Sequence, residues 1–343
     1  MPRARSFQFL TNTAVVMAVL LVIEVLIFSL MSENFFTADN IRNVLVQSVF
    51  ILLLAVGMTF VLITGGIDLS VGAVLGFSAG MSVFVLLITE SFALSILAGL
   101  GAGVLVGLVN GLMVAKLGIN DFIVTLGTLG VAAGALRLLD ADRPLREFDS
   151  PAFDAMANER VIGIPVPVII GAGVVLFLEF VLRRTAFGRA VFATGISRKA
   201  AGLAGVRVDR VRIGVFVLSG FVAAIAGLLL ASRLGSVPAR LGSGFELEAI
   251  AAAVLGGTAL AGGRGSVLGT VVGALILGTL DNGLQLIGVD VAWFRVIAGA
   301  SIVAAMALDE RIRNIVLSRL RSIGDASSAG GDTAAGYREA FKP

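Results

Sequence analysis

Residues 62–76, which read LITGGIDLSVGAVLG, place a carboxylate and a hydroxyl inside an otherwise apolar run. Gly65 and Gly66 let the backbone bend or unwind, and Asp68 and Ser70 follow directly. A carboxylate at membrane depth costs about 3 kcal/mol unless it faces protein or water. The pattern therefore fits either a polar pivot or ion site at membrane depth, or a tight turn between two helices with Asp68 as an ordinary helix N-cap.

The composition places the chain in a membrane. Hydrophobic residues make up 57% of the 343 residues, charged residues only 14%, and 43 residues are glycine. A soluble domain cannot bury that much apolar surface, whereas glycine-rich apolar helices pack closely in lipid. The sequence therefore predicts an all-α, polytopic membrane helix bundle.

The chain lacks the side chains on which most enzymes and metal sites depend. It has no cysteine and no histidine, which excludes disulfides, thiolates, imidazole metal ligands and Ser–His pairs. Its three lysines, Lys116, Lys199 and Lys342, do not lie in a GxxxxGK[ST] nucleotide-binding pattern. We therefore expect no metal and no cofactor on this chain, and ATP must bind a separate subunit.

Apolar segments of about 20 residues predict ten transmembrane helices. They are 13–30, 44–63, 69–88, 92–115, 119–139, 164–182, 211–234, 249–261, 266–287 and 292–308. The eighth is too short to span comfortably, so we expect a half-helix or re-entrant piece there. The first has no small-residue cleavage site, and we interpret it as a retained anchor.

The charges of the loops predict the orientation, because cytoplasmic loops are enriched in Lys and Arg. Residues 183–212 hold eight basic residues and one acid, whereas residues 140–160 hold six acids and three basic residues. The first loop is therefore expected in the cytoplasm and the second outside. With ten spans, both termini then lie in the cytoplasm, and Trp293 anchors a helix at the outer interface. Because the positive charge gathers beside the membrane, we expect lipid, and not nucleic acid, as its partner.

The predicted organisation has four parts. Residues 1–12 form a cytoplasmic N-terminus, and residues 13–308 form the transmembrane domain. Residues 309–321 (DERIRNIVLSRLR) mix apolar residues with arginines, which predicts an amphipathic helix on the inner membrane surface. Ser, Gly and Ala dominate residues 322–343, which predicts a disordered tail.

Two glycine pairs indicate an internal parallel repeat. Gly65 and Gly66, followed by SVGAVLG, are similar to Gly262 and Gly263, followed by SVLGTVVG.

The loop 183–212 contains a short predicted helix. Ser197 is a candidate N-cap, about two turns follow, and Gly205 is a candidate C-terminal glycine. The apolar residues between them, among them Ala200 and Ala201, are small. Because so short a helix is unstable alone in water, it must pack on its own bundle or dock against a soluble partner.

The chain resembles the permease subunits of bacterial ABC importers for monosaccharides, the ribose/xylose/arabinose/galactoside group, over roughly residues 41–309. Several blocks in the family's order carry the resemblance. They are GMTFVLITGGIDLSVGAVLG (57–76), NGLMVAKLGINDFIVTLGTLG (110–130), FGRAVFATG (187–195), AGLAGVRVDRVRI (201–213) and LASRLGSVPARLGSGFELEAIAAAVLGGTALAGGRGSVLGT (230–270).

This resemblance implies a pore-forming subunit of the bacterial inner membrane that pairs with a second permease copy or a close relative. An external sugar-binding protein would dock outside, and cytoplasmic ATPase subunits would dock inside. The short helix then corresponds to the coupling helix that sits in an ATPase cleft. The residues implied in this coupling are Gly188, Gly195, Ser197, Ala200, Ala201 and Gly205.

Two segments depart from the family pattern. Where relatives carry Gly-Asn and two acids, this chain has Ile196, Ser197, Arg198 and Lys199, which places positive charge at a helix N-terminus. A complementary acidic rim is therefore expected on its ATPase. The segment DADRPLREF (140–148) also lacks the family's Thr-Gly-Gly-Arg-Pro run.

A path for a neutral, hydroxyl-rich sugar needs hydrogen-bonding groups at membrane depth. The path or gate candidates are Gly65, Gly66, Asp68, Ser70, Asn110, Thr125 and Asn282. Each polar one fits interhelical hydrogen bonding or capping equally well. Other polar residues in or beside the spans are Glu24, Asp121, Glu179, Asp281 and Gln285; Glu179 is expected to pair with Arg183 or Arg184, and Glu24 to face the bundle.

Two rival classes remain open. An ion-coupled secondary transporter of a small polar solute would use Asp68 as an ion or proton site. A membrane enzyme would use paired carboxylates such as Asp68 and Asp121.

Overall fold

The computed structural model describes residues 13–142, 145, 148 and 150–290, together with 292–294, 296, 297, 299, 300 and 303. The predicted N-terminal segment 1–12, inner-surface helix 309–321 and tail 322–343 lie outside the described residues. About half of the predicted tenth span lies outside them as well.

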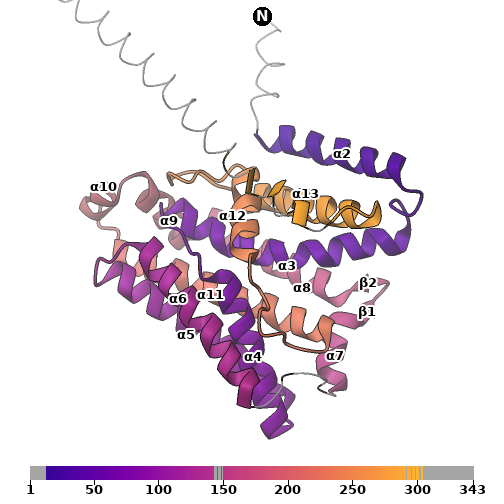
Figure 1. The fold of residues 1–343 in the computed structure, drawn as a ribbon. Helices are drawn as coiled ribbons and strands as arrows, with labels where there is room; N and C mark the ends of the chain where they lie inside the picture. Colours follow the sequence, from indigo (N-terminus) through magenta and orange to yellow (C-terminus); the bar gives the residue numbers. More distant parts are fainter. Residues whose placement is uncertain are drawn as a thin grey trace, which may run out of the picture. The chain divides into compact units, whose positions relative to one another are not determined.

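Helices dominate the described chain (Figure 1). The long ones are α2 (Thr13–Met31), α3 (Ala38–Ile63), α4 (Val71–Thr89), α5 (Phe92–Ala115), α6 (Asp121–Asp142), α8 (Val166–Arg184), α11 (Val208–Leu234) and α13 (Val267–Leu286). The short elements are α7 (Pro151–Asn158), α9 (Ala186–Ile196), α10 (Arg198–Leu203) and α12 (Phe245–Leu255), with the antiparallel strands β1 (Arg160–Val161) and β2 (Ile164–Pro165). Seven described helices, α3 to α6, α8, α11 and α13, are long and apolar enough to cross a membrane. The predicted all-α polytopic bundle is confirmed.

The first nine predicted spans each correspond to an observed helix, although their ends differ. Helix α3 begins at Ala38 instead of residue 44, because the Thr37 side chain accepts the Asn40 N–H at 3.3 Å and caps the helix. Hydropathy does not reveal such a cap. Helix α12 covers 245–255 instead of 249–261, and its 11 residues extend about 16 Å. It is therefore too short to span, as expected for the eighth segment.

Helix α3 forms the centre of the core. Nearly all side chains from Val46 to Ile63 are buried, and α11, α12 and α13 pack around them. Helices α5 and α11 approach most closely at Gly103 and Gly220, where a Cβ on either residue would overlap the backbone of the other. Such contact between small residues is how helices pack in lipid, where the hydrophobic effect does not drive them together.

The two ends of the bundle differ in charge. Near the start of α11, Arg212 donates to the Val114 carbonyl oxygen at the end of α5 (3.2 Å), and α9 and α10 lie at this basic end. Near the other end of α11, Ser232 donates to the Phe153 carbonyl oxygen in α7. The 27 residues of α11 extend about 40 Å. The basic loop and α7, which belongs to the acid-rich segment of the sequence, therefore lie at opposite ends.

Candidate functional site

The segment between α3 and α4 is a tight turn recessed inside the bundle. The N–H groups of Thr64, Gly65 and Gly66 fold back onto the carbonyl oxygens of Val61 and Leu62, at 2.8–3.1 Å. Gly65 has φ +71°, a conformation that side chains other than glycine adopt at a cost. A Cβ at Gly66 would lie 3.0 Å from Asp121 Oδ2. The glycine pair therefore allows both the reversal of the chain and its close approach to α6.

Asp68 is buried and fully engaged in hydrogen bonds. Its side chain accepts the Ser70 N–H (3.0 Å) and the Ser70 hydroxyl (2.6 Å) through Oδ1, and the Ser219 hydroxyl (2.9 Å) through Oδ2. Only 2% of the residue is exposed. The interpretation of Asp68 as an N-cap is wrong, because α4 begins at Val71 and Ser70 holds the cap position. Asp68 instead ties the turn to α11.

The network extends from Ser70 into two more helices. Asn110 of α5 donates its amide to the Ser70 hydroxyl at 3.0 Å, and Thr128 of α6 donates to Asn110 Oδ1 at 2.6 Å. Ser70 and Asn110 have no exposed surface. We call Asp68, Ser70, Asn110, Thr128 and Ser219 the Asp68 network. It joins the α3–α4 turn to α5, α6 and α11.

Asp121 and Thr125 hold the turn from the α6 side. Asp121 Oδ2 accepts the Ile67 N–H at 2.7 Å, and the Thr125 hydroxyl lies 3.4 Å from the Ile67 carbonyl oxygen and 2.8 Å from that of Asp121. Asp68 and Asp121 therefore accept hydrogen bonds from different donors and hold the turn from two sides.

Asn282 lies away from the other path candidates. It exchanges two amide hydrogen bonds with Asn40, at 2.9 and 3.0 Å. Asn40 is at the start of α3, and the turn follows the end of that helix, about 35 Å away along its axis. The structure therefore brings Gly65, Gly66, Asp68, Ser70, Asn110 and Thr125 together and leaves Asn282 in a contact between α3 and α13.

Two members of the network were missed in the sequence. Ser219 and Thr128 are hydroxyl residues in long apolar segments. Their only signal is that each is polar in an apolar helix, and such hydroxyls usually bond the preceding turn of their own helix. Thr128 does so as well, at 3.0 Å from the Val124 carbonyl oxygen.

The basic loop forms two capped helices. Thr185 accepts the Gly188 N–H and Ser197 accepts the Ala200 N–H, each at 3.2 Å, so both helix starts have the side-chain caps that short helices need. Gly205 has φ +85° and ends the α10 turn. The predicted short helix is confirmed at Arg198–Leu203.

The exposed side of α10 differs from the predicted docking surface. Ala201 is only 4% exposed and faces the bundle, so it supports α10 and does not lie on the surface. Leu203 is 84% exposed. The apolar side chains available for docking on this helix are therefore Ala200, as predicted, and the larger Leu203.

The loop and the turn are in direct contact at the basic end. Gly195 lies against Ile63 so closely that a Cβ there would overlap the Ile63 carbonyl oxygen. That oxygen accepts the Gly263 N–H at 2.8 Å, and the Arg198 guanidinium donates to the Gly65 carbonyl oxygen at 3.3 Å. We call Ile63, Gly65, Gly195, Arg198 and Gly263 the junction. The junction joins the basic loop, which is predicted to couple to the ATPase, to the α3–α4 turn, which is predicted to act as a gate of the transport path.

The two glycine pairs that suggested a repeat also meet here. A Cβ at Gly262 would lie 2.9 Å from the Gly65 nitrogen.

Positive charge surrounds α10. A groove of about 610 Å³ around Leu203 is lined by five basic residues: Lys116, Arg198, Lys199, Arg207 and Arg210. One acidic residue, Asp209, also lines the groove. Asp209 already pairs with Lys116 at 3.1 Å. The groove therefore keeps an excess of positive charge.

Two further carboxylates have contrasting surroundings. Glu179 pairs with Arg183 at 3.2 Å, as predicted. Both carboxylate oxygens of Glu24 are buried, and neither has a hydrogen-bond partner among the described residues.

The chain is similar to known permeases in sequence and in fold. A family model described as "Branched-chain amino acid transport system / permease component" matches residues 40–306. The ribose import permease protein of Bacillus subtilis (strain 168) is 40% identical over 292 residues, which cover 85% of this chain and 91% of that protein. The D-allose transport system permease protein of Escherichia coli (strain K12) is 38% identical, with 86% and 90% covered. The fructose import permease protein of Rhizobium meliloti is 37% identical, with 89% and 87% covered.

A solved chain shares the fold. It is described as an inward-facing conformation of a metal-chelate type ABC transporter and superposes with a TM-score of 0.51 at 17% identity, covering 87% of this chain and 98% of that chain.

Proposed function

The chain belongs to the family of branched-chain amino acid transport system permease components, and on this premise we propose that it is the membrane-spanning subunit of an ATP-driven ABC importer for a monosaccharide. Relatives named for import of ribose, fructose and D-allose support the substrate class. The importer works in the bacterial inner membrane.

The observation that carries this proposal is the junction. A coupling element is useful only if its movement reaches the transport path, and Arg198 contacts Gly65 directly. Gly195 packs on the carbonyl oxygen of Ile63, at the end of α3. No flexible linker separates the loop from the turn, so a displacement of α10 reaches the start of α4 through packed backbone.

The Asp68 network extends this connection. When ATPase closure tilts α10, the turn moves with it, and Asp68, Ser70 and Asn110 transmit the motion to α5 and α11 through hydrogen bonds of 2.6–3.0 Å. Breaking and remaking such bonds between buried helices gives discrete arrangements instead of a continuous deformation. Alternating access to the path follows from two such arrangements.

The partners follow from the same assignment. ATPase subunits bind the groove around α10 at the basic end, which faces the cytoplasm together with both termini. A sugar-binding protein delivers the solute at the opposite end, and a second permease copy or a close relative completes the path. The positive-inside pattern of the loops supports this orientation.

The surroundings of Asp68 favour this function over ion-coupled transport. A proton carrier must release its hydrogen bonds and reach water, whereas Asp68 accepts three hydrogen bonds and is 2% exposed. These three donors hold the Asp68 side chain in place as a structural tie between the turn and α11.

The test is uptake into proteoliposomes that hold the complete transporter, with the sugar-binding protein outside and ATP inside. Labelled D-ribose, D-fructose and D-allose are offered in turn. Uptake that requires ATP and continues when a protonophore is present supports the proposal. Uptake without ATP that the protonophore abolishes contradicts it and supports the secondary transporter.

A further inference from the structure

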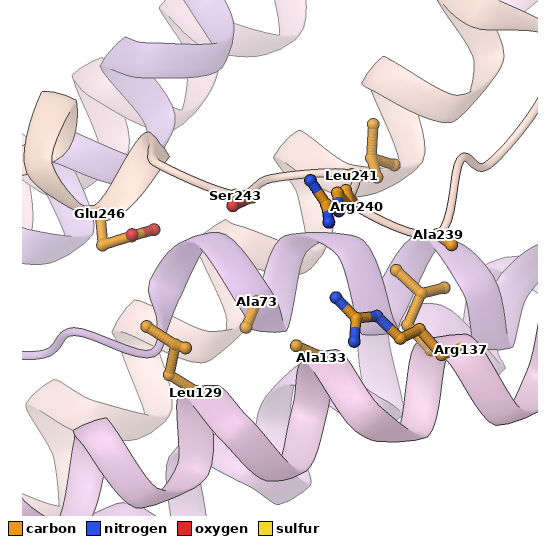
Figure 2. Close-up of a pocket in the computed structure, with 10 residues that line it drawn as sticks. Ala73, Leu129, Ala133, Arg137, Ala239, Arg240, Leu241, Ser243 and Glu246 are labelled. Atoms are coloured by element: carbon orange, nitrogen blue, oxygen red, sulfur yellow. The ribbon is translucent and has the colours of Figure 1, made fainter. Parts of the chain in front are cut away.

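A pocket of about 190 Å³ lies beside the Asp68 network, between α4, α6 and the segment that joins α11 to α12 (Figure 2). Helix α6 connects the two sites, because Thr128 belongs to the network and Leu129, Ala133 and Arg137 line the pocket. Ala73, in the first turn of α4, lines it as well. Since α6 runs from the basic end towards the acidic end, the pocket lies on the acidic side of the network.

Two guanidinium groups from different elements point into this space. Arg137 extends from α6, and Arg240 extends from the joining segment opposite it (Figure 2). Among the described residues, neither has an ion pair. A charged side chain on a membrane-spanning helix must face protein or water, so this side of α6 faces the pocket and not lipid.

The joining segment is held firmly enough to position its side chains. Gly242, with φ +83°, lies against Gly72 of α4 so closely that a Cβ would overlap the Gly72 carbonyl oxygen. A Cβ at Gly76 would overlap the Leu241 carbonyl oxygen in the same way. The Ser243 N–H donates to the Arg240 carbonyl oxygen at 3.1 Å. Arg240 therefore projects from an ordered turn packed against α4.

The polar groups of the pocket match a solute with adjacent hydroxyls. A guanidinium presents parallel N–H donors in a planar fork that engages two neighbouring oxygens, and the Ser243 hydroxyl adds an acceptor. Leu129, Ala133 and Ala73 supply an apolar wall for the C–H face of a ring. A few convergent polar groups on an apolar wall are typical of small-molecule sites.

We propose that this pocket is a solute subsite on the entry side of the path, where Arg137 and Arg240 hold a single polyhydroxylated ring before it passes the Asp68 network. This inference rests on the proposed transport function and adds the residues that receive the solute. It assigns the first contact to two arginine side chains that the polar pattern of the spans did not reveal.

Protection of a single cysteine tests the subsite. Because the natural chain has no cysteine, Ser243→Cys places one thiol at the pocket, and Glu90→Cys places one at the exposed turn between α4 and α5 as a matched control. Labelling by an impermeant maleimide is measured in the complete transporter with and without saturating sugar, using D-ribose, D-fructose or D-allose, whichever the wild type imports. We expect the sugar to slow labelling at position 243 by about tenfold and to leave position 90 unchanged. Equal labelling rates at position 243 with and without the imported sugar, or no labelling there at all, would overturn the subsite.

Uptake by arginine variants provides the second measurement. Arg137→Gln and Arg240→Gln each remove a charged donor and are expected to lower the maximal uptake rate roughly tenfold, in line with one charge-assisted hydrogen bond. Arg233 lies in the last turn of α11 and does not line the pocket, so Arg233→Gln is the matched control. This variant should import the sugar normally. Normal uptake in both pocket variants contradicts the subsite while leaving the importer assignment intact. Absence of ATP-driven uptake in the wild type instead contradicts the proposed function itself.

Discussion

The Arg198 guanidinium donates a hydrogen bond to the carbonyl oxygen of Gly65 at 3.3 Å, although 133 residues separate them along the chain. Arg198 starts α10, and Gly65 lies in the turn that follows α3. An exposed hydrogen bond of this length contributes little stability. Its importance is positional, because it shows that the loop and the turn share one packed contact.

The first prediction concerns the closest approach in that contact. Gly195→Ala places a methyl group on the Ile63 carbonyl oxygen, and relieving such an overlap costs about 1–3 kcal/mol. We expect the complete transporter to hydrolyse ATP while sugar uptake falls at least about tenfold, because the loop no longer seats on the turn. The ratio of sugar imported to ATP hydrolysed is the measurement.

Gly173→Ala is the matched control for this variant. Gly173 lies in α8, away from the groove around α10, with open space around it, so an added methyl meets no atom and improves helix propensity. It should leave the ratio unchanged. Equal behaviour of the two alanine variants would contradict a role for the packed contact.

The second prediction concerns docking. Leu203→Asp replaces an exposed apolar side chain by a charged one. Because burying an unpaired carboxylate in an interface is unfavourable, we expect the permease to be produced normally and to lose its ATPase during purification. Ala204→Asp, also exposed but just outside α10, tests whether any added acid has this effect. Full ATPase recovery with Leu203→Asp would show that α10 docks by another face.

The third prediction separates a structural carboxylate from a proton carrier. Asp68→Asn keeps an oxygen that accepts the Ser70 N–H, and the Ser219 hydroxyl can rotate to accept from the new amide. It should retain substantial ATP-driven uptake. Asp68→Leu leaves buried hydroxyls without their partner, at about 1–3 kcal/mol for each unsatisfied group, and should lose most uptake. An inactive Asp68→Asn, together with wild-type uptake that a protonophore abolishes, would favour the secondary transporter.

Gly66→Val belongs to the same turn and tests its close packing. A Cβ there already reaches 3.0 Å from Asp121 Oδ2 and 3.3 Å from a Val61 methyl, and valine adds two more carbons. We expect an inactive transporter with a lowered melting temperature. Gly66→Ala adds only the Cβ and should lower the melting temperature less than Gly66→Val does; an equal loss in both variants would point to backbone strain instead.

The fourth prediction concerns Asn282, a path candidate that pairs with Asn40. A double-mutant cycle of Asn40→Ala and Asn282→Ala should show a coupling of about 1 kcal/mol in unfolding stability, because each single variant leaves one buried amide without its partner. If Asn282 instead lines the path, Asn282→Ala would change uptake, and the two substitutions would add independently in stability. Thermal denaturation and sugar uptake of the same four proteins distinguish these outcomes.

The fifth prediction is the orientation. Lys199 and Ala152 are both exposed and lie at opposite ends of the bundle. In intact cells an impermeant maleimide should label Ala152→Cys and not Lys199→Cys, and permeabilised cells should label both. The reverse pattern in intact cells would invert the topology.

Much of the fold could be predicted from the sequence because lipid imposes one constraint that a linear pattern expresses. A spanning segment must be apolar and about 20 residues long, so eight long helices and the short α12 could be read along the chain. Caps such as Ser197 and helix-ending glycines such as Gly205 act within a few residues and were equally readable. The charge difference between the two ends was visible for the same reason.

The contacts that define the candidate site depend on distances that the linear pattern does not contain. Asp68 stood out because a carboxylate is rare in an apolar run, whereas its partner Ser219 is an ordinary hydroxyl 151 residues away. Arg137 and Arg240 share a pocket only because the joining segment folds back onto α4. Ala201 was expected to take part in ATPase coupling, yet the rotation of α10 buries it. The sequence by itself determined which segments cross the membrane, since burial in lipid depends on each segment's own composition; the tertiary structure alone decided which polar groups meet, since that depends on how helices distant in the chain pack and rotate against one another.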